Sequence, residues 1–221
     1  MRTTSMIASM LGLSFAGSAA AAMVDPFTTA SSVNNGASAT YADSSSAFSG
    51  GLWNYRTVSA QVLDTAKASS QASVSGGNFV FAVSQVGTSQ NSTQRAKVAY
   101  SMSGGGAGPD FTNFTSLTFN YTATFTFGVR VAIAGMTTGS YVQLQNIAAG
   151  SGTLTFTAAQ FAINPTLIND VATMSVELFR NGGNTSGSVT ISNLEANGVP
   201  APGAIALLGA AGTIGFARRR R

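Results

Sequence analysis

A strict alternation of apolar and polar residues between positions 117 and 127 constrains the fold more than any other feature of the sequence. Threonine or asparagine occupies the even positions of this segment. The odd positions hold Leu117, Phe119, Tyr121, Ala123, Phe125 and Phe127. Because side chains alternate between faces along a β-strand, the pattern predicts a strand with one buried and one solvated face. Val129, Val131 and Ile133 continue the alternation beyond Gly128, where we expect a bend or a bulge.

Further short segments have the composition of strands, and turn-forming residues separate them. The expected strands are 57–63, 78–86, 96–102, 141–147, 152–157, 172–179 and 187–194. The expected turns are 75–77, 103–109, 135–139, 149–152 and 181–187. No segment of this region has the pattern of a capped amphipathic helix, although 158–161 and 166–170 could each form one helical turn. This organisation predicts an all-β domain, a two-sheet, jelly-roll-like sandwich that spans 23–197.

Residues 23–51 differ from the rest of this domain. They are rich in serine, alanine and asparagine and contain few large apolar side chains. We therefore expect them to be loosely ordered, or to form an edge strand with long loops that begins to pair near 38–41.

The first 22 residues have the organisation of a secretory signal peptide. Arg2 supplies a positive charge, residues 6–16 are apolar, and small residues follow at 17–22. The apolar run is too short to span a bilayer, which needs about 20 residues. Cleavage after Ala20, Ala21 or Ala22 would satisfy the small-residue rule, and we prefer Ala22. The secretion translocon and signal peptidase are therefore expected partners.

The C-terminal region combines three elements. Val199, Pro200, Ala201 and Pro202 precede an uncharged run at 203–217, and Arg218, Arg219, Arg220 and Arg221 follow it. As a helix this run would be about 22 Å long, which is shorter than the ~30 Å hydrocarbon core of a bilayer. The prolines keep the preceding element extended, and the arginines favour the cytoplasmic side. Such a segment is suited to anchor the protein in the membrane temporarily, until a protease cleaves it.

This arrangement resembles the PEP-CTERM sorting signal of Gram-negative bacteria, which has a Pro-Glu-Pro-like motif, a hydrophobic helix and an arginine cluster. Ala201 stands where that motif has glutamate. The resemblance implies a sorting segment at 198–221 with a short transmembrane helix at 203–217. It also implies an exosortase-like processing enzyme as partner, and transfer from the inner membrane to the cell surface or the extracellular matrix. A weaker resemblance, to the jelly-roll sandwiches of carbohydrate-binding modules, is carried by segments 50–53, 75–79 and 187–196.

The charge of the chain and its missing residue types exclude several functions. Arg2 and the four terminal arginines account for five of eleven basic residues, so six remain in the body against seven acidic ones. The high pI therefore gives no reason to expect a nucleic-acid partner. The sequence has no histidine and no cysteine, which removes the commonest general base and all thiolate chemistry. No two carboxyl groups have the sequence spacing of a catalytic motif such as the acid pair that glycoside hydrolysis needs. We expect no enzymatic activity, no cofactor and no metal, although a calcium ion near Asp110 and Glu195 is the alternative.

Aromatic side chains are the remaining candidates for ligand contact. Trp53, Tyr55, Tyr100 and Tyr141 have rings with a polar tip that suits a wet surface. Residues two apart share a strand face, so Trp53 and Tyr55 form the preferred sugar-contact pair, and a core position for Trp53 is the competing interpretation. The sequence thus favours a non-enzymatic exported protein associated with exopolysaccharide or biofilm matrix. The alternative is a lectin-like, carbohydrate-binding module.

Overall fold

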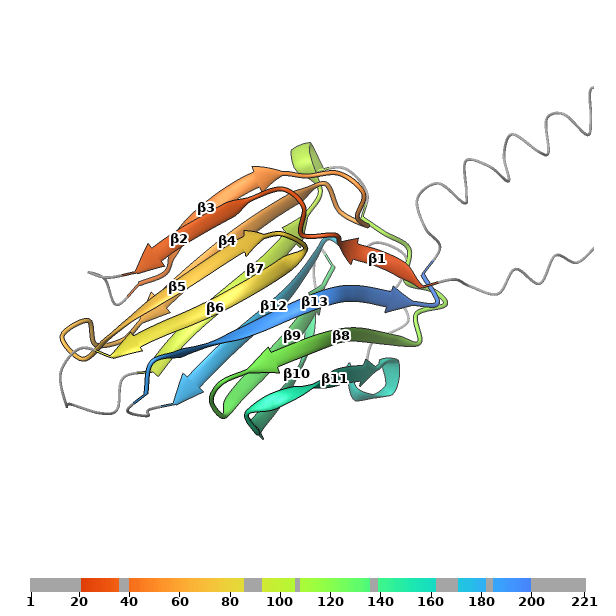
Figure 1. The fold of residues 1–221 in the computed structure, drawn as a ribbon. Helices are drawn as coiled ribbons and strands as arrows, with labels where there is room; N and C mark the ends of the chain where they lie inside the picture. The colour runs from red at the N-terminus through yellow and green to blue at the C-terminus, as the bar shows by residue number, and fades with distance from the viewer. Residues whose placement is uncertain are drawn as a thin grey trace, which may run out of the picture.

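The computed structural model describes residues 21–35, 40–85, 93–105, 108–135, 139–161, 171–181 and 185–199, and these form two antiparallel sheets (Figure 1). The first sheet has the order β11 (Gly150–Thr157), β8 (Ser116–Ala123), β13 (Gly187–Asn197), β6 (Asn78–Gln85), β5 (Ala68–Ser75), β2 (Ser31–Asn35), and β1 (Ala22–Asp25) also pairs with β13. The second has the order β10 (Gly139–Ile147), β9 (Phe127–Ala134), β12 (Thr173–Asn181), β7 (Thr93–Ser101), β4 (Tyr55–Val62), β3 (Ala42–Ala47). The prediction of an all-β, two-sheet sandwich is confirmed.

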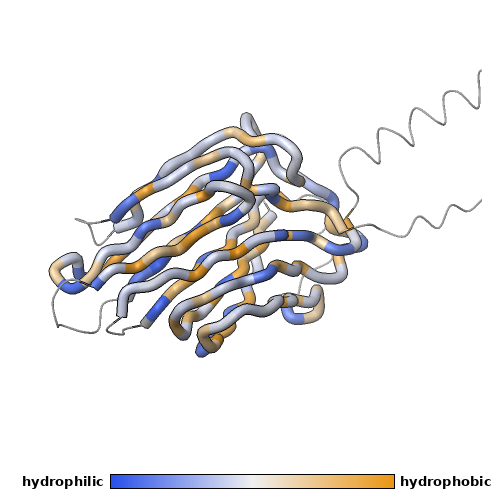
Figure 2. Tube along the Cα trace, viewed as in Figure 1, coloured by the Kyte–Doolittle hydropathy of each residue, from blue (hydrophilic) through white to orange (hydrophobic). Residues whose placement is uncertain are grey.

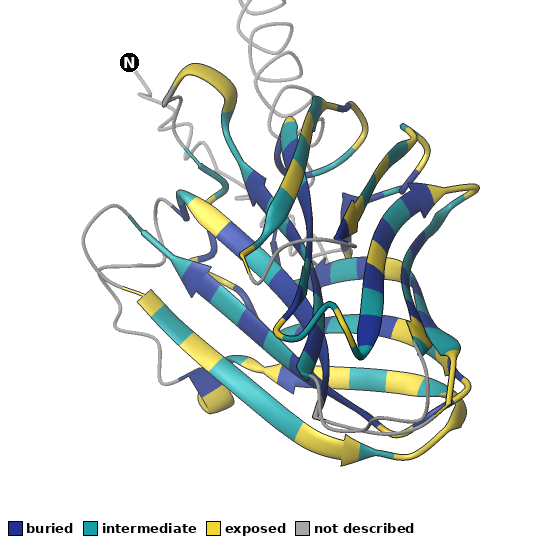
Figure 3. Cartoon of the chain, turned by 90° about the vertical axis from the view of Figure 1, so that its left-hand side faces the viewer, coloured by how far each residue is buried: buried dark blue, intermediate teal, exposed yellow. Residues whose placement is uncertain are grey.

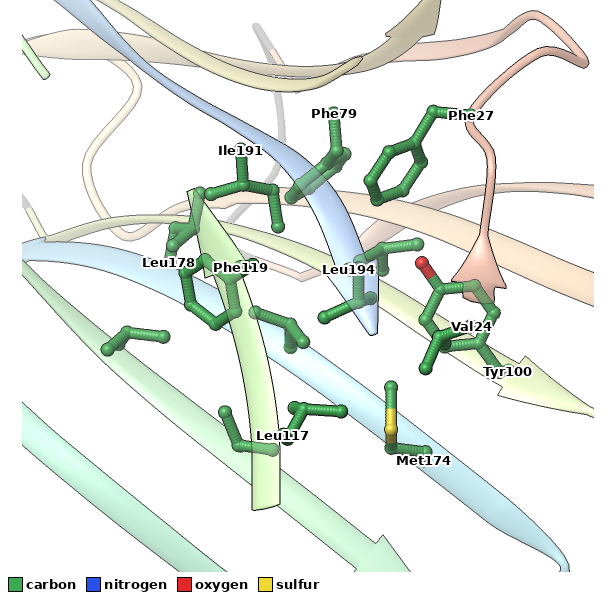
Figure 4. Packing of buried hydrophobic residues seen from close by; sticks show 14 of the residues in the cluster. Val24, Phe27, Phe79, Tyr100, Leu117, Phe119, Met174, Leu178, Ile191 and Leu194 are labelled. Carbon is green, nitrogen blue, oxygen red and sulfur yellow. The ribbon is translucent and has the colours of Figure 1, made fainter. Parts of the chain in front are cut away.

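A single apolar core lies between the two sheets. Hydropathy and burial alternate along the strands, as a sheet with one inner and one outer face requires (Figures 2 and 3). The inner face of β6 contributes Phe79 and Phe81, and β12 contributes Val176 and Leu178, all fully buried. Figure 4 shows side chains from both sheets packed together in this core. The strand periodicity of the sequence therefore produces a continuous hydrophobic layer.

The long alternating segment is divided between the two sheets, contrary to the expected single strand with a bend at Gly128. β8 ends at Ala123 in the first sheet, and β9 begins at Phe127 in the second. The alternation continues across this connection because the inner faces of both sheets meet in the same core. Gly128 instead gives room to a neighbouring ring, since a Cβ there would lie 2.2 Å from Cζ of Phe179.

Residues 23–51 are more regular than expected. Their described part contains β1, β2 and β3, so the expectation of loose order is wrong for these residues. The edge-strand alternative fits better, because β2 and β3 are the outermost strands of the two sheets. Pairing of β3 begins at Ala42, and residues 36–39 lie outside the described part of the chain.

The sandwich extends slightly beyond both expected boundaries. Ala22 is buried and pairs with Ala196, and Val199 is buried after a turn at Gly198. The signal peptide up to Ala20, the segment 200–221 with its membrane helix, and the possible turn at 166–170 lie outside the described residues. The turn at 158–161 is confirmed as the 3-10 element η2 (Ala158–Phe161), and η1 (Ser103–Gly105) is a second one. Within the described ranges, no helix is long and apolar enough to cross a bilayer.

A fully buried ion pair connects β1 to β4. Nη1 of Arg56 lies 2.8 Å from Oδ2 of Asp25, and neither side chain is exposed. Oδ1 of Asp25 accepts a hydrogen bond from the backbone N–H of Phe27 at 2.7 Å, and Nη2 of Arg56 donates to the carbonyl oxygen of Thr29. These bonds hold the N-terminal strand and the positive-φ residue Phe27 against the second sheet. Charges in such a place are tolerated only when they are paired and hydrogen-bonded.

Candidate functional site

A row of polar side chains runs across the outer face of the second sheet. Antiparallel register places one outward residue from each of the six strands in line, from β3 to β10. We call this row the polar ladder, and its members are Asp43, Ser59, Lys97, Glu177, Arg130 and Gln143. Neighbouring side chains cover Ser59 completely, and it is 0% exposed. Residues directly opposite on neighbouring strands are close enough to interact, so the ladder brings together groups far apart in the sequence.

Glu177 contacts side chains both inside and beside this ladder. Its Oε1 accepts hydrogen bonds from Nη1 of Arg95 and from the hydroxyl of Tyr41, both at 3.0 Å. Its Oε2 lies 3.7 Å from Nη1 of Arg130. Arg130 also donates from Nε and Nη2 to Oε1 of Gln143, at 3.1 and 3.0 Å. Groups held in this way on a rigid sheet keep little side-chain freedom.

Burial hides the carboxylate of Glu177 more than the two arginines that pair with it. The side chain of Glu177 is 9% exposed, whereas those of Arg95 and Arg130 are 34% and 39% exposed. Burial, followed by the charge and hydrogen bond of Glu177, raises the pKa of Tyr41 to about 12. The Tyr41 hydroxyl therefore remains a donor to Glu177 throughout the neutral range. Nζ of Lys97 lies 4.6 Å from the centre of the Tyr41 ring, which places another cation on this face.

Two rows of mostly short side chains lie beside the polar ladder. We call these rows the trough. The first row consists of Ser45, Thr57, Ala99, Ser175, Ala132 and Tyr141. The second consists of Ala47, Tyr55, Ser101, Thr173, Ala134 and Gly139. A pocket of about 270 Å³ lies in the trough, and Thr57, Lys97, Ala99 and Ser175 are among its lining residues. The long side chains of the polar ladder therefore rise beside a lower surface made by the short side chains of the trough.

An exposed aromatic ring lies at the β10 end of the trough. Tyr141 is 63% exposed, which is unusual for an aromatic residue in the middle of a strand. The guanidinium carbon of Arg130 lies 5.0 Å from the centre of its ring. Tyr55 on β4, near the other end of the strand order, is half-buried and lies on the same outer face as Tyr141. The trough thus has aromatic groups near both ends and hydrogen-bonding groups along one side.

The structure separates the two residues expected to form a sugar-contact pair. Trp53 is 1% exposed, its Nε1 donates to the carbonyl oxygen of Val171 at 3.2 Å, and its ring stacks on Tyr100. Its ring is therefore unavailable to a ligand. Trp53 precedes β4 in a bent segment, so the two-residue strand period does not apply to it. Of this pair, Tyr55 alone reaches the outer face, and of the other candidates Tyr100 is buried and Tyr141 is exposed.

The remaining expected sites are separate from this face or lie outside the described residues. Oδ1 of Asp110 accepts a hydrogen bond from the backbone N–H of Thr112 at 2.8 Å, which is a local turn contact. In the described part of the chain, no group of three or more acidic side chains is placed to hold a metal ion. Of the processing motif the structure describes Val199 alone, and 218–221 lie outside its ranges.

Sequence reasoning missed Lys97, Glu177, Arg130 and Gln143 as a group. These residues belong to four strands, and only the register across the sheet brings them together. A signal was nevertheless present, because only 8% of the chain is charged and several of these charges fall in the middle of strands. Charged residues are uncommon in strand centres unless a partner or a ligand satisfies them.

No protein-family model matches this chain, and no curated protein matches it. Solved structures with a similar arrangement include a family 11 carbohydrate-binding module from Clostridium thermocellum in complex with a β-1,3-1,4-mixed-linked tetrasaccharide, at 12% identity over 82% of this chain and 97% of that one, with a TM-score of 0.42. A family 11 xylanase from Neocallimastix patriciarum is 11% identical over 76% of this chain and 99% of that one, with a TM-score of 0.39. At these scores the likenesses carry no argument about the ligand or activity of this chain.

Proposed function

We propose that this chain is an exported, non-enzymatic protein that binds a polysaccharide in the trough of its second sheet. The observation that carries the proposal is the trough itself, which combines a 270 Å³ pocket, an exposed tyrosine and a bordering row of fixed polar side chains. A polysaccharide of the extracellular matrix is the partner that this surface and the export signals of the sequence together favour.

The geometry of the trough matches the chemistry of a glycan chain. Sugar rings have apolar faces that pack on aromatic rings, and their hydroxyls both donate and accept hydrogen bonds. Tyr141 supplies an exposed ring, while Arg130 and Gln143 supply donors and acceptors beside it. Because backbone pairing and mutual contacts already hold these groups, little side-chain freedom is lost when a ligand binds.

The spacing of the carboxylates supports binding without hydrolysis. Glycoside hydrolysis uses two carboxyl groups about 5–9.5 Å apart. Within the described residues of the polar ladder, the carboxylates are Asp43 and Glu177, and the register places two strands between theirs. Three strand spacings of about 4.8 Å put them roughly 14 Å apart. Both oxygens of Glu177 are also engaged by arginine side chains.

Replacing Tyr141 by alanine is expected to weaken binding of a glycan that the unmodified protein selects from an array about tenfold, because the stacking surface is lost. The variant should fold normally, since the side chain is 63% exposed. Leu63→Ala is a matched control, because Leu63 is also exposed (50%) but lies outside the trough. If calorimetry finds that Tyr141→Ala and the unmodified protein bind the glycan equally well, the trough is not the glycan-binding surface.

The export part of the proposal rests on the two ends of the sequence and is tested separately. Mass spectrometry of protein from the extracellular fraction should find chains that end near Pro200–Pro202. Cleavage after Ala20 would preserve β1 whole, because Ala22 is buried in that strand. An extracellular form that retains Arg221 would rule out processing at the sorting motif, without affecting the glycan test.

A further inference from the structure

A pocket of about 490 Å³ lies on the other side of the polar ladder from the trough. Its exposed rim includes Thr124, Thr126, Gln145 and Asn146, from the β8–β9 connection and the end of β10. Phe179 and Arg180, near the end of β12, are among the buried residues that line it. Its volume is typical of small-molecule sites, which measure about 300–1,000 Å³.

The pocket contains a buried cation that no carboxylate of the described residues neutralises. Arg180 is 6% exposed, and none of the ion pairs formed by the described residues includes it. Its Nη1 donates to the carbonyl oxygen of Thr185 at 2.5 Å, its Nη2 donates to Oγ1 of Thr185 at 3.2 Å, and its guanidinium carbon lies 4.6 Å from the Phe125 ring centre. Burial lowers the pKa of Arg180 below its ordinary value. The contacts among the described residues use two of the five N–H groups of the guanidinium.

The rim of the pocket carries a strained backbone. The register of β10 against β9 shifts between Leu144 and Ile147, and Asn146 in this bulge has a φ of 58°. Bulges redirect side chains and are frequent beside binding sites, and asparagine adopts a positive φ more readily than most residues do. The opposite wall is fixed, because the Thr124 hydroxyl accepts a hydrogen bond from the Ser188 N–H at 2.9 Å.

We propose that this pocket binds a sugar acid, with the Arg180 guanidinium on the carboxylate and the Asn146 and Gln145 amides on the hydroxyls. A planar carboxylate fits the paired donors of a guanidinium, and an anion would supply a negative charge that the described residues do not place beside Arg180. A small inorganic anion would leave most of a 490 Å³ pocket and its polar rim unused. This site is independent of the trough and goes beyond the proposed function.

The test is a calorimetric titration of the full-length protein with glucuronate and galacturonate, with glucose, galactose and sodium sulfate as separate probes. Both uronates should bind at least ~10-fold more tightly than the neutral sugars, since charge-assisted hydrogen bonds are about twice as strong as neutral ones. Arg180→Gln should reduce uronate affinity by at least ~10-fold, because it removes the charge and the paired donors.

Asn146→Gly is the second variant, because glycine accepts the positive φ and preserves the bulge while removing the amide. This variant should weaken uronate binding about threefold, because one neutral hydrogen bond is lost. It also keeps the proposal testable if Arg180→Gln does not fold. Equal affinity for uronates and neutral sugars, stronger binding of sulfate, or unchanged uronate binding in both variants would each overturn the proposal. Because free monosaccharides are used, failure of polysaccharide binding in the trough does not affect this result.

Discussion

Arg56→Met and Asp25→Asn are each expected to destabilise the fold by about 3–5 kcal/mol, because removal of one partner leaves the other charge buried and unpaired. Both side chains of this pair are fully buried, 2.8 Å apart. Loss of the pair would also remove the side-chain hydrogen bond that joins β1 to β4. Urea unfolding of each variant, with the slope compared to that of the unmodified protein, measures the change.

A double variant and an exposed pair provide the controls for this prediction. Asp25→Leu with Arg56→Met should be less destabilising than the sum of the two single changes, because neither charge remains to be buried. Lys67→Met breaks an ion pair of the same length, 2.8 Å, whose side chains are 36% and 37% exposed, and should leave stability almost unchanged. Single variants of the buried pair that unfold at the same urea concentration as Lys67→Met would show that the pair is not buried as described.

Trp53→Ala is the second large effect, with an expected loss of about 3–5 kcal/mol. The indole ring lies 6.0 Å from the Tyr100 ring and 5.8 Å from the Phe111 ring, centre to centre, and its N–H donates to Val171. Its removal leaves a cavity and an unsatisfied carbonyl where three segments meet. Thermal or urea unfolding measures the loss, and Trp53→Phe should recover part of it.

The same residue distinguishes a core role from a sugar contact. Trp53 is the only tryptophan, so its fluorescence reports on one position. Because it is 1% exposed, glycan binding should leave its emission unchanged, and Trp53→Phe should bind as the unmodified protein does. If the glycan quenches the Trp53 fluorescence and Trp53→Phe no longer binds, then Trp53 is part of the binding site.

The sequence predicts strands well where inner and outer positions differ strongly. β8 alternates large apolar residues with serine, threonine and asparagine, and β9 alternates phenylalanine, valine and isoleucine with small residues and one arginine. The tight turn at Gly76 and Gly77 is equally clear. β5 was missed because its inner positions are Ala68, Ser70, Ala72 and Val74, which hardly differ in polarity from its outer ones. The change of sheet between β8 and β9 was missed for another reason: both sheets present the same alternation to one core.

The candidate site was less predictable because it depends on register. Tyr55 and Tyr141 were recognised as possible contacts from their chemistry, but the choice of Trp53 assumed a strand where the chain bends. Glu177 meets Lys97 and Arg130 through pairing with two different neighbours of β12. Residues about 50 to 80 positions apart cannot be aligned from a single sequence unless the strand order is known.

Amide chemical-shift mapping of the protein, titrated with oligosaccharides from an extracellular polysaccharide, tests the central claim most directly. We expect the largest shifts at Ala99, Ser175, Ala132 and Tyr141, which lie side by side in the trough on four strands of the second sheet. Shifts confined to the first sheet, or saturation binding with no change in β7, β12 and β9, would contradict the assignment of this face as the glycan-binding surface.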